Sequence, residues 1–180
     1  MRNTLQLPQA SELERQLAEL QPGMHGLTIL PLFAGERSTG WRVDARAAIT
    51  GLAASTTPLQ ILHAALESVV LRFRNVYDLM TTSLGVPQEV IASGGGLLHS
   101  RSWTKMMADG LPHSVTLCLE PEATSRGAAL TALERIGAIR DIGDLVPKLG
   151  IAVPSDESKK PFYDTSLEQQ RRLYNKLFEG

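Results

Sequence analysis

The feature that most constrains this fold is a short apolar run followed by a glycine turn and an amphipathic segment, over residues 90–111. The apolar run Val90–Ala92 has the length of a buried strand in an α/β sheet. Three consecutive glycines follow: Gly94, Gly95 and Gly96. Glycines let the backbone turn tightly and leave its amide groups uncovered, because they carry no Cβ.

The residues after the turn predict a helix. Its apolar residues recur at helical spacing: Trp103, Met106, Met107 and Leu111. Ser100 or Ser102 is suited to cap its first turn. A strand that ends in glycines just before a helix is typical of an anion or phosphate site. The turn matches neither the phosphate loop GxxxxGK[ST] nor the dinucleotide pattern GxGxxG, so a plain tight connection is the alternative.

The composition bounds the kind of protein. A chain of 180 residues with 43% hydrophobic residues predicts one domain with a substantial core. The net charge of -1, with 18 scattered lysines and arginines, argues against nucleic-acid and membrane-surface partners. Cys118 is the single cysteine and the four histidines are far apart in sequence, so neither a disulfide framework nor a metal site is expected. No signal peptide or membrane-spanning run is recognisable, which favours a cytoplasmic protein.

Hydrophobic periodicity and capping residues predict the remaining elements. Helices are expected at 10–20, from Thr57 and Pro58 to Gly85, at 124–137, at 142–148, and at 165–178, the last opened by a capping box. Strands are expected at 27–33 and 114–119, the second nearer an edge of the sheet than 90–92. Residues 44–51 are expected to be irregular. This order of helices and strands favours an α/β fold.

Three separated motifs extend this interpretation. They are residues 30–38 (LPLFAGERS), residues 91–109 with the glycine turn, and residues 122–129 (EATSRGAA). In order and spacing, residues 26–137 resemble the C-terminal domain of the FGGY-type carbohydrate kinases. Residues 34–41 and the pair Leu97 and Leu98 are most similar to the gluconokinase branch.

The resemblance implies a fold and an activity. The fold would be an α/β domain of the ribonuclease-H-like, actin-like ATPase type, forming the C-terminal lobe of a sugar kinase. The chain would divide into an N-terminal helical segment at 1–25, a core domain at 26–138 and a C-terminal helical extension at 139–180. The implied reaction is phosphoryl transfer from ATP, with Mg²⁺, to a sugar or sugar acid, with gluconate as the best candidate. ATP and ADP are therefore the implied ligands.

The resemblance also implies roles for single residues. The nucleotide-binding residues would be Gly94, Gly95, Gly96 and Ser100. Support for the cleft between the lobes would come from Glu36, Arg37 and Gly127. Glu36 and Arg37 are expected to form an ion pair, and Gly127 to pack against a neighbouring backbone. Asp109 is expected to be solvated on its helix.

The family pattern predicts what this chain lacks as well. A family member binds sugar and ATP between two lobes, and its catalytic Asp would fall upstream of Met1. The chain is therefore expected to be a C-terminal fragment, inactive without the N-terminal portion, and no catalytic or metal-binding residue is assigned. A sheet without its first strands exposes an unpaired edge, which makes homodimerisation or aggregation an expected risk.

Two alternatives stay open at this stage. The chain could be a non-catalytic remnant, or an interaction domain that keeps the kinase fold. It could also be an unrelated α/β domain in which the three glycines form only a turn.

Overall fold

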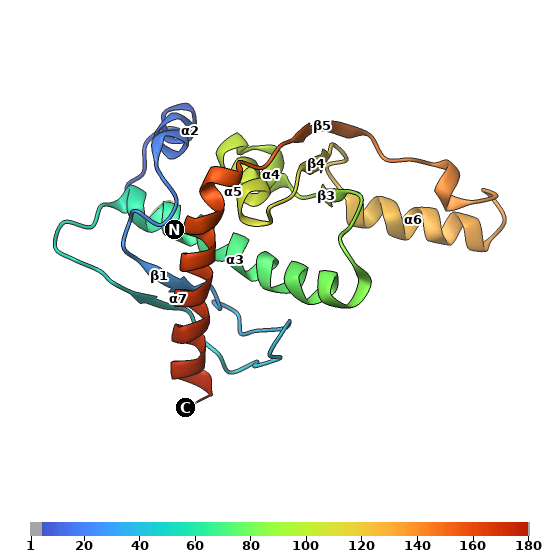
Figure 1. The fold of residues 1–180 in the computed structure, drawn as a ribbon. Coiled ribbons are helices and arrows are strands. Elements are labelled where there is room, and N and C mark those ends of the chain that lie inside the picture. The colour runs from blue at the N-terminus through green and yellow to red at the C-terminus, as the bar shows by residue number, and fades with distance from the viewer. Residues whose placement is uncertain (1–4, 180) are drawn as a thin grey trace.

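The computed structural model describes residues 5–179 (Figure 1). Within them, the helices are α2 (Ala10–Glu19), α3 (Pro58–Leu84), α4 (Gly95–Leu98), α5 (Arg101–Gly110), α6 (Ala123–Arg135) and α7 (Lys160–Phe178). Two 3₁₀ turns, η1 (Ile142–Asp144) and η2 (Glu157–Lys159), lie between α6 and α7. The strands are β1 (Thr28–Leu30), β2 (Ala48–Thr50), β3 (Val90–Ala92), β4 (Val115–Cys118) and β5 (Leu149–Val153). None of the described helices combines the length and hydropathy needed to cross a bilayer.

Helix α3 is the longest element and runs through the middle of the molecule (Figure 1). Thr57 and Gln60 form a capping box, in which each side chain accepts a hydrogen bond from the other residue's backbone N–H. Pro58 sits in the first turn, where its missing N–H leaves no hydrogen bond unmade. Gly85 ends the helix with φ at 82°, a value that disfavours other residues. The predicted start and end of this helix are confirmed.

The described strands form two sheets, and the larger has three strands in the order β3-β4-β5. Strands β3 and β4 are parallel, and β4 and β5 are antiparallel. The expectation that 114–119 lies nearer an edge than 90–92 is wrong, because the unpredicted strand β5 pairs with the outer side of β4. Strand β3 is one of the two edge strands, and Ile91 is 50% exposed, so the prediction of a buried strand is also wrong.

The smaller sheet pairs β1 with β2 in antiparallel register, Ile29 facing Ile49. The expectation of irregular structure at 44–51 is wrong, because Ala48–Thr50 is a strand. Three residues are too few to show an alternating pattern, and their partner lies twenty positions upstream. Strand β1 stops at Leu30, since Pro31 has no N–H to offer a neighbouring strand.

The main core lies where α3, α5 and α7 meet strand β4. Its buried residues are Val70, Leu71, Leu97, Met106, Met107, Ala108, Leu111, Val115, Tyr163 and Leu167. Helix α7 begins at Lys160, not at 165, so the predicted capping box is wrong. Thr165 lies inside the helix, where its hydroxyl donates to the Pro161 carbonyl at 2.9 Å. The early start of α7 is what brings Tyr163 into the core.

Helix α6 extends away from the three-stranded sheet (Figure 1). None of its described residues is buried, and Ile136, just beyond its end, is 75% exposed. The prediction that Gly127 packs against a neighbour is wrong, because a Cβ built there meets nothing within 4 Å. Small residues at helical spacing indicated a buried stripe, but no other described element covers them.

Candidate functional site

The glycine turn follows the C-terminal end of β3. Gly94 has φ at 121°, a conformation that L side chains rarely adopt, so glycine is required there by the backbone alone. Its carbonyl accepts from the amides of Leu97 and Leu98, each at 3.2 Å, which starts the short helix α4. The N–H groups of Gly95 and Gly96 find no acceptor among the described residues. Two uncovered amide donors therefore lie side by side at the strand end, as an anion site requires.

The three glycines serve different purposes. A Cβ on Gly95 would meet nothing within 4 Å, so the space above its backbone is open to a ligand. A Cβ on Gly96 would lie 2.8 Å from Cζ3 of Trp103, so that glycine is required by packing. Trp103 is held in place by its Nε1–H, which donates to the Leu66 carbonyl at 3.3 Å. Gly95 is thus the position at which a ligand can approach the backbone.

Ser100 caps helix α5. Its side-chain oxygen accepts from the Trp103 N–H at 3.2 Å, as the sequence predicts for one of the two serines. Ser102 instead donates its hydroxyl to the Glu14 carbonyl at 3.0 Å and ties α5 to α2. Ser100 lies just after the short helix that the glycine turn begins. The hydroxyl hydrogen of Ser100 has no acceptor among the described residues.

A cavity of about 290 Å³ lies beside the turn, between β3, β4 and α6. Ser93, Gly127 and the buried thiol of Cys118 line it. Glu120 and Arg126 also line it, with 3.9 Å between carboxylate and guanidinium. The Glu120 carboxylate accepts from the Lys148 N–H at 3.2 Å. The structure thus brings Gly127 to the same cavity as Ser93, although Gly127 packs against no neighbouring backbone.

Glu36 and Arg37 do not form the predicted ion pair. Glu36 is only 3% exposed and pairs with the guanidinium of Arg72 from α3. Its second oxygen accepts from the Tyr174 hydroxyl of α7 at 2.5 Å. Burial and this bond to Glu36 raise the pKa of Tyr174. Arg37 is exposed instead, because the loop turns its side chain outward while Glu36 points into the molecule.

Asp109 is also placed differently from the prediction. It is 7% exposed, not solvated, and pairs with Lys105 one helical turn earlier. Its carboxylate accepts from the Asp156 N–H at 2.7 Å, which anchors the segment before α7. The i,i+4 spacing of Lys105 and Asp109 was visible in the sequence, but the covering segment was not.

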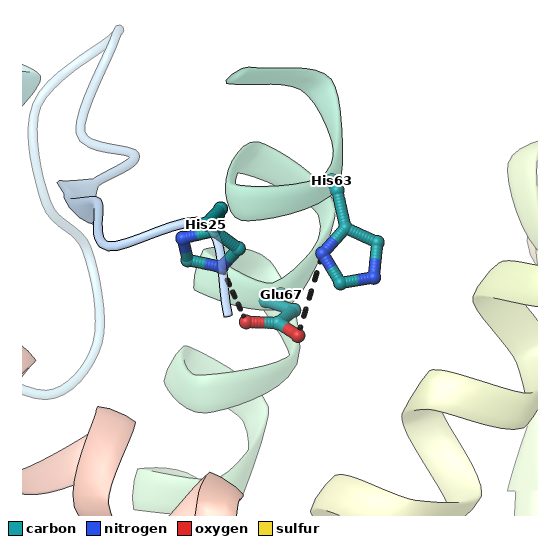
Figure 2. A group of neighbouring side chains, drawn as sticks. All are labelled: His25, His63 and Glu67. Atoms are coloured by element: carbon teal, nitrogen blue, oxygen red, sulfur yellow. Dashed lines mark hydrogen bonds and ion pairs between the residues drawn. The ribbon is translucent and has the colours of Figure 1, made fainter. Parts of the chain in front are cut away.

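His25, from the loop after α2, meets His63 and Glu67 of helix α3 (Figure 2). Glu67 accepts from Nε2 of His25 at 2.8 Å and from the Gly23 N–H at 3.2 Å. Only the i,i+4 spacing of His63 and Glu67 could have indicated the cluster from sequence, and nothing in the sequence placed His25 beside them.

The hydrogen bonds of this cluster do not fit a metal site. The Leu27 N–H donates to Nδ1 of His25 at 3.0 Å, so Nδ1 carries no proton and Nε2 must carry one. A metal on Nε2 would require loss of that proton, whereas a ligating histidine normally donates from its other ring nitrogen. The cluster therefore joins the loop around Gly23 to α3 through a neutral His25.

Comparison with known proteins decides the family. The sequence signature described as the FGGY family of carbohydrate kinases, C-terminal domain, matches residues 2–134. This chain belongs to that family. The FGGY chain is 32% identical to a glycerol kinase of Pseudarthrobacter chlorophenolicus over 168 residues, covering 93% of this chain and 32% of that protein. It is 29% identical to a gluconokinase of Bacillus subtilis over 146 residues, covering 79% and 28%.

Solved structures agree on the fold. The xylulose kinase from Rhodospirillum rubrum superimposes with a TM-score of 0.76 at 32% identity, over 93% of this chain and 34% of that one. A gluconate kinase from Lactobacillus acidophilus gives a TM-score of 0.70 at 19% identity, which supports the fold alone. The FGGY chain thus has the sugar-kinase C-terminal domain fold of the actin-like ATPases, with a C-terminal helix, and spans about a third of these proteins. The predicted boundaries after residues 25 and 138 stay predictions.

Proposed function

We propose that this FGGY chain contributes the nucleotide-binding surface of an ATP-dependent carbohydrate kinase, with the phosphates of ATP or ADP lying over Gly95. The observation that carries the proposal is the pair of uncovered amides at Gly95 and Gly96, together with the open space above Gly95. A phosphate oxygen needs donors of this kind, and a Cβ built on Gly95 meets no atom of the described residues within 4 Å.

The chain would bind and orient the nucleotide and would supply no catalytic side chain. Phosphoryl transfer depends mainly on alignment and charge stabilisation, and Mg²⁺ carried by the nucleotide supplies part of that stabilisation. Among the described residues, Glu120 is the carboxylate lining the cavity beside the turn, and it already accepts from the Lys148 N–H. We therefore assign it no catalytic role, and we infer that the acceptor and its catalytic base belong to other parts of a whole kinase.

Gluconate is the acceptor we propose to test first. Residues 34–41 and the similarity to gluconokinases support it. Glycerol and xylulose are the matched alternatives, because relatives named for those acceptors are as similar to the chain. Use of ATP as the donor also agrees with a cytoplasmic location for the proposed activity.

Calorimetric titration of residues 1–180 with Mg·ADP tests the nucleotide site. We expect weak saturable binding that Gly95→Val abolishes, because a branched side chain would occupy the space above the amides. Ala54→Val, in the exposed loop before α3, is the control and should bind as the unmodified chain does. Equal affinity in the Gly95→Val variant would remove the turn from the site. Absence of binding by a folded chain would favour the interaction-domain alternative.

A further inference from the structure

A cavity of about 370 Å³ lies on another part of the molecule, among α2, α3, α5 and the start of α7. Figure 1 shows α2, α5 and the start of α7 gathered at one end of the structure. The cavity floor includes the apolar side chains of Leu17 and Met106. Its volume is within the range of pockets that hold small metabolites. The glycine turn takes no part in its lining.

One wall of this cavity includes Tyr163, whose buried hydroxyl lacks a partner among the described residues. Tyr163 is 1% exposed and lines the cavity, and its hydroxyl has no hydrogen bond within the described residues. Burial, and then the nearby carboxylates of Glu67 and Asp109, raise the pKa of Tyr163, so the group stays a neutral O–H donor. A buried donor without an acceptor destabilises the chain, and a ligand that accepts from it recovers the lost hydrogen bond.

A second buried group, His63, lines the same cavity. Its Nδ1 lies 3.6 Å from the Glu67 carboxylate, which favours the proton on Nδ1. Figure 2 shows the other ring nitrogen pointing away from Glu67, and it has no hydrogen-bond partner among the described residues. Burial lowers the pKa of His63 and keeps the ring neutral, so Nε2 is an acceptor. A donor and an acceptor on one cavity suit a hydroxyl group, which can satisfy both.

The mouth of the cavity has an excess of positive charge. Three cations and two carboxylates line it: Arg101, Lys105, Lys159, Asp109 and Asp156. Asp109 is neutralised by Lys105, and the Asp156 carboxylate accepts from the backbone and hydroxyl of Ser158. The Lys159 ammonium donates to the neutral side chain of Gln21, and neither Lys159 nor Arg101 forms an ion pair among residues 5–179. An anionic group at the mouth would complete the charge balance.

We infer that this cavity binds a small anion bearing at least one hydroxyl group, with the anion beside Arg101 and Lys159 and the hydroxyl between Tyr163 and His63. A hydroxylated phosphate monoester and a hydroxylated carboxylate share this chemistry. The inference does not depend on nucleotide binding at the glycine turn, because the two sites share no lining residue.

Calorimetry with residues 1–180 tests this site through matched probes. Glycerol 3-phosphate and propyl phosphate carry the same anion and differ in their hydroxyl groups, while glycerate offers a carboxylate in place of the phosphate. We expect saturable binding of glycerol 3-phosphate or glycerate, with propyl phosphate about tenfold weaker than glycerol 3-phosphate. The stronger of the two hydroxylated probes identifies the class of anion.

Two variants locate the binding. Tyr163→Phe keeps the buried ring and removes only the unpartnered hydroxyl, so the preference for glycerol 3-phosphate over propyl phosphate should shrink, because only His63 is left to bind the ligand hydroxyl. Arg101→Gln should weaken every anion about tenfold, whereas Arg140→Gln, an exposed cation beyond α6, should change none of them. Arg101 is exposed, so its variant tests the site even if Tyr163→Phe were to fold poorly. Failure of both hydroxylated probes to bind a folded chain overturns the inference, as does an unchanged preference in Tyr163→Phe.

Discussion

Glu36 is a buried carboxylate held by donors from two helices, Arg72 of α3 and Tyr174 of α7. It fixes the loop after β1 against both helices, and its own backbone N–H donates to the Arg42 carbonyl at 2.7 Å. A buried charge that loses its partner is costly, since water cannot replace the missing cation. Substitution of Arg72 therefore tests whether its ion pair with Glu36 anchors this loop.

Arg72→Met should lower the free energy of unfolding by about 3 kcal/mol, because it leaves Glu36 buried with only the Tyr174 hydroxyl. Arg37→Met removes the same kind of charge from the exposed neighbour and should change stability by less than about 0.5 kcal/mol. Urea denaturation of both variants measures the two values. A loss in Arg37→Met as large as that in Arg72→Met would contradict the assignment of Arg72 as the partner that stabilises Glu36.

His63 should make stability depend on pH. Burial lowers its pKa in the folded chain below the ordinary value of 6.5, so the unfolded chain takes up a proton first as the pH falls. Stability should therefore be full above pH 6.5 and fall below it, with a slope of at most about 1.4 kcal/mol per pH unit.

Urea unfolding at pH 7.5 and pH 5.5 measures this effect. The His63→Gln variant should lose less stability between the two values than the unmodified chain, and His99→Gln, an exposed histidine, should behave as the unmodified chain does. If His99→Gln alone reduced the pH effect, the loss of stability would come from His99, and the assignment to His63 would be wrong.

At the scale of elements, substitutions in the glycine turn can distinguish the role of Gly96 in packing from the role of Gly95 in ligand access. Gly96→Ala should lower the free energy of unfolding by about 1–3 kcal/mol, because its Cβ would lie 2.8 Å from the anchored ring of Trp103. Gly95→Ala should leave stability unchanged or slightly raised, since its Cβ meets nothing. Thermal melts of the two alanine variants distinguish packing from ligand access. A large loss in Gly95→Ala would show that Gly95 also serves the fold.

Local signals predicted the long, capped elements and missed the short, paired ones. Thr57, Pro58 and Gly85 define α3 through caps that act within a few residues, and Ser100 does the same for α5. Strands β2 and β5 depend on partners distant in sequence, and Gly150 interrupts the apolar pattern of β5. The glycine turn was found because glycine itself is the signal. The cluster of His25, His63 and Glu67 was missed because only the tertiary fold brings it together.

At the scale of the whole molecule, the described sheet ends at β3, which pairs with β4 on one side only. An apolar cavity of about 440 Å³ lies beside that edge, lined by Phe73, Met80, Leu84, Val86 and Ile91 among others. Unpaired strands next to apolar surface favour further association. The chain also spans about a third of the kinases it matches, 32% of the glycerol kinase and 34% of the xylulose kinase. The homodimer expected from the edge stays a prediction.

The nucleotide site is the central claim, and backbone amide NMR tests it most directly. Mg·ADP should be titrated into ¹⁵N-labelled chain while the signals of Gly95 and Gly96 are followed. Both N–H groups lack an acceptor within the described residues, so phosphate should move them more than other amides in the chain. Saturable shifts centred on Gly95 and Gly96 are the expected result. Saturable shifts centred elsewhere, with these two signals unmoved, would contradict the account.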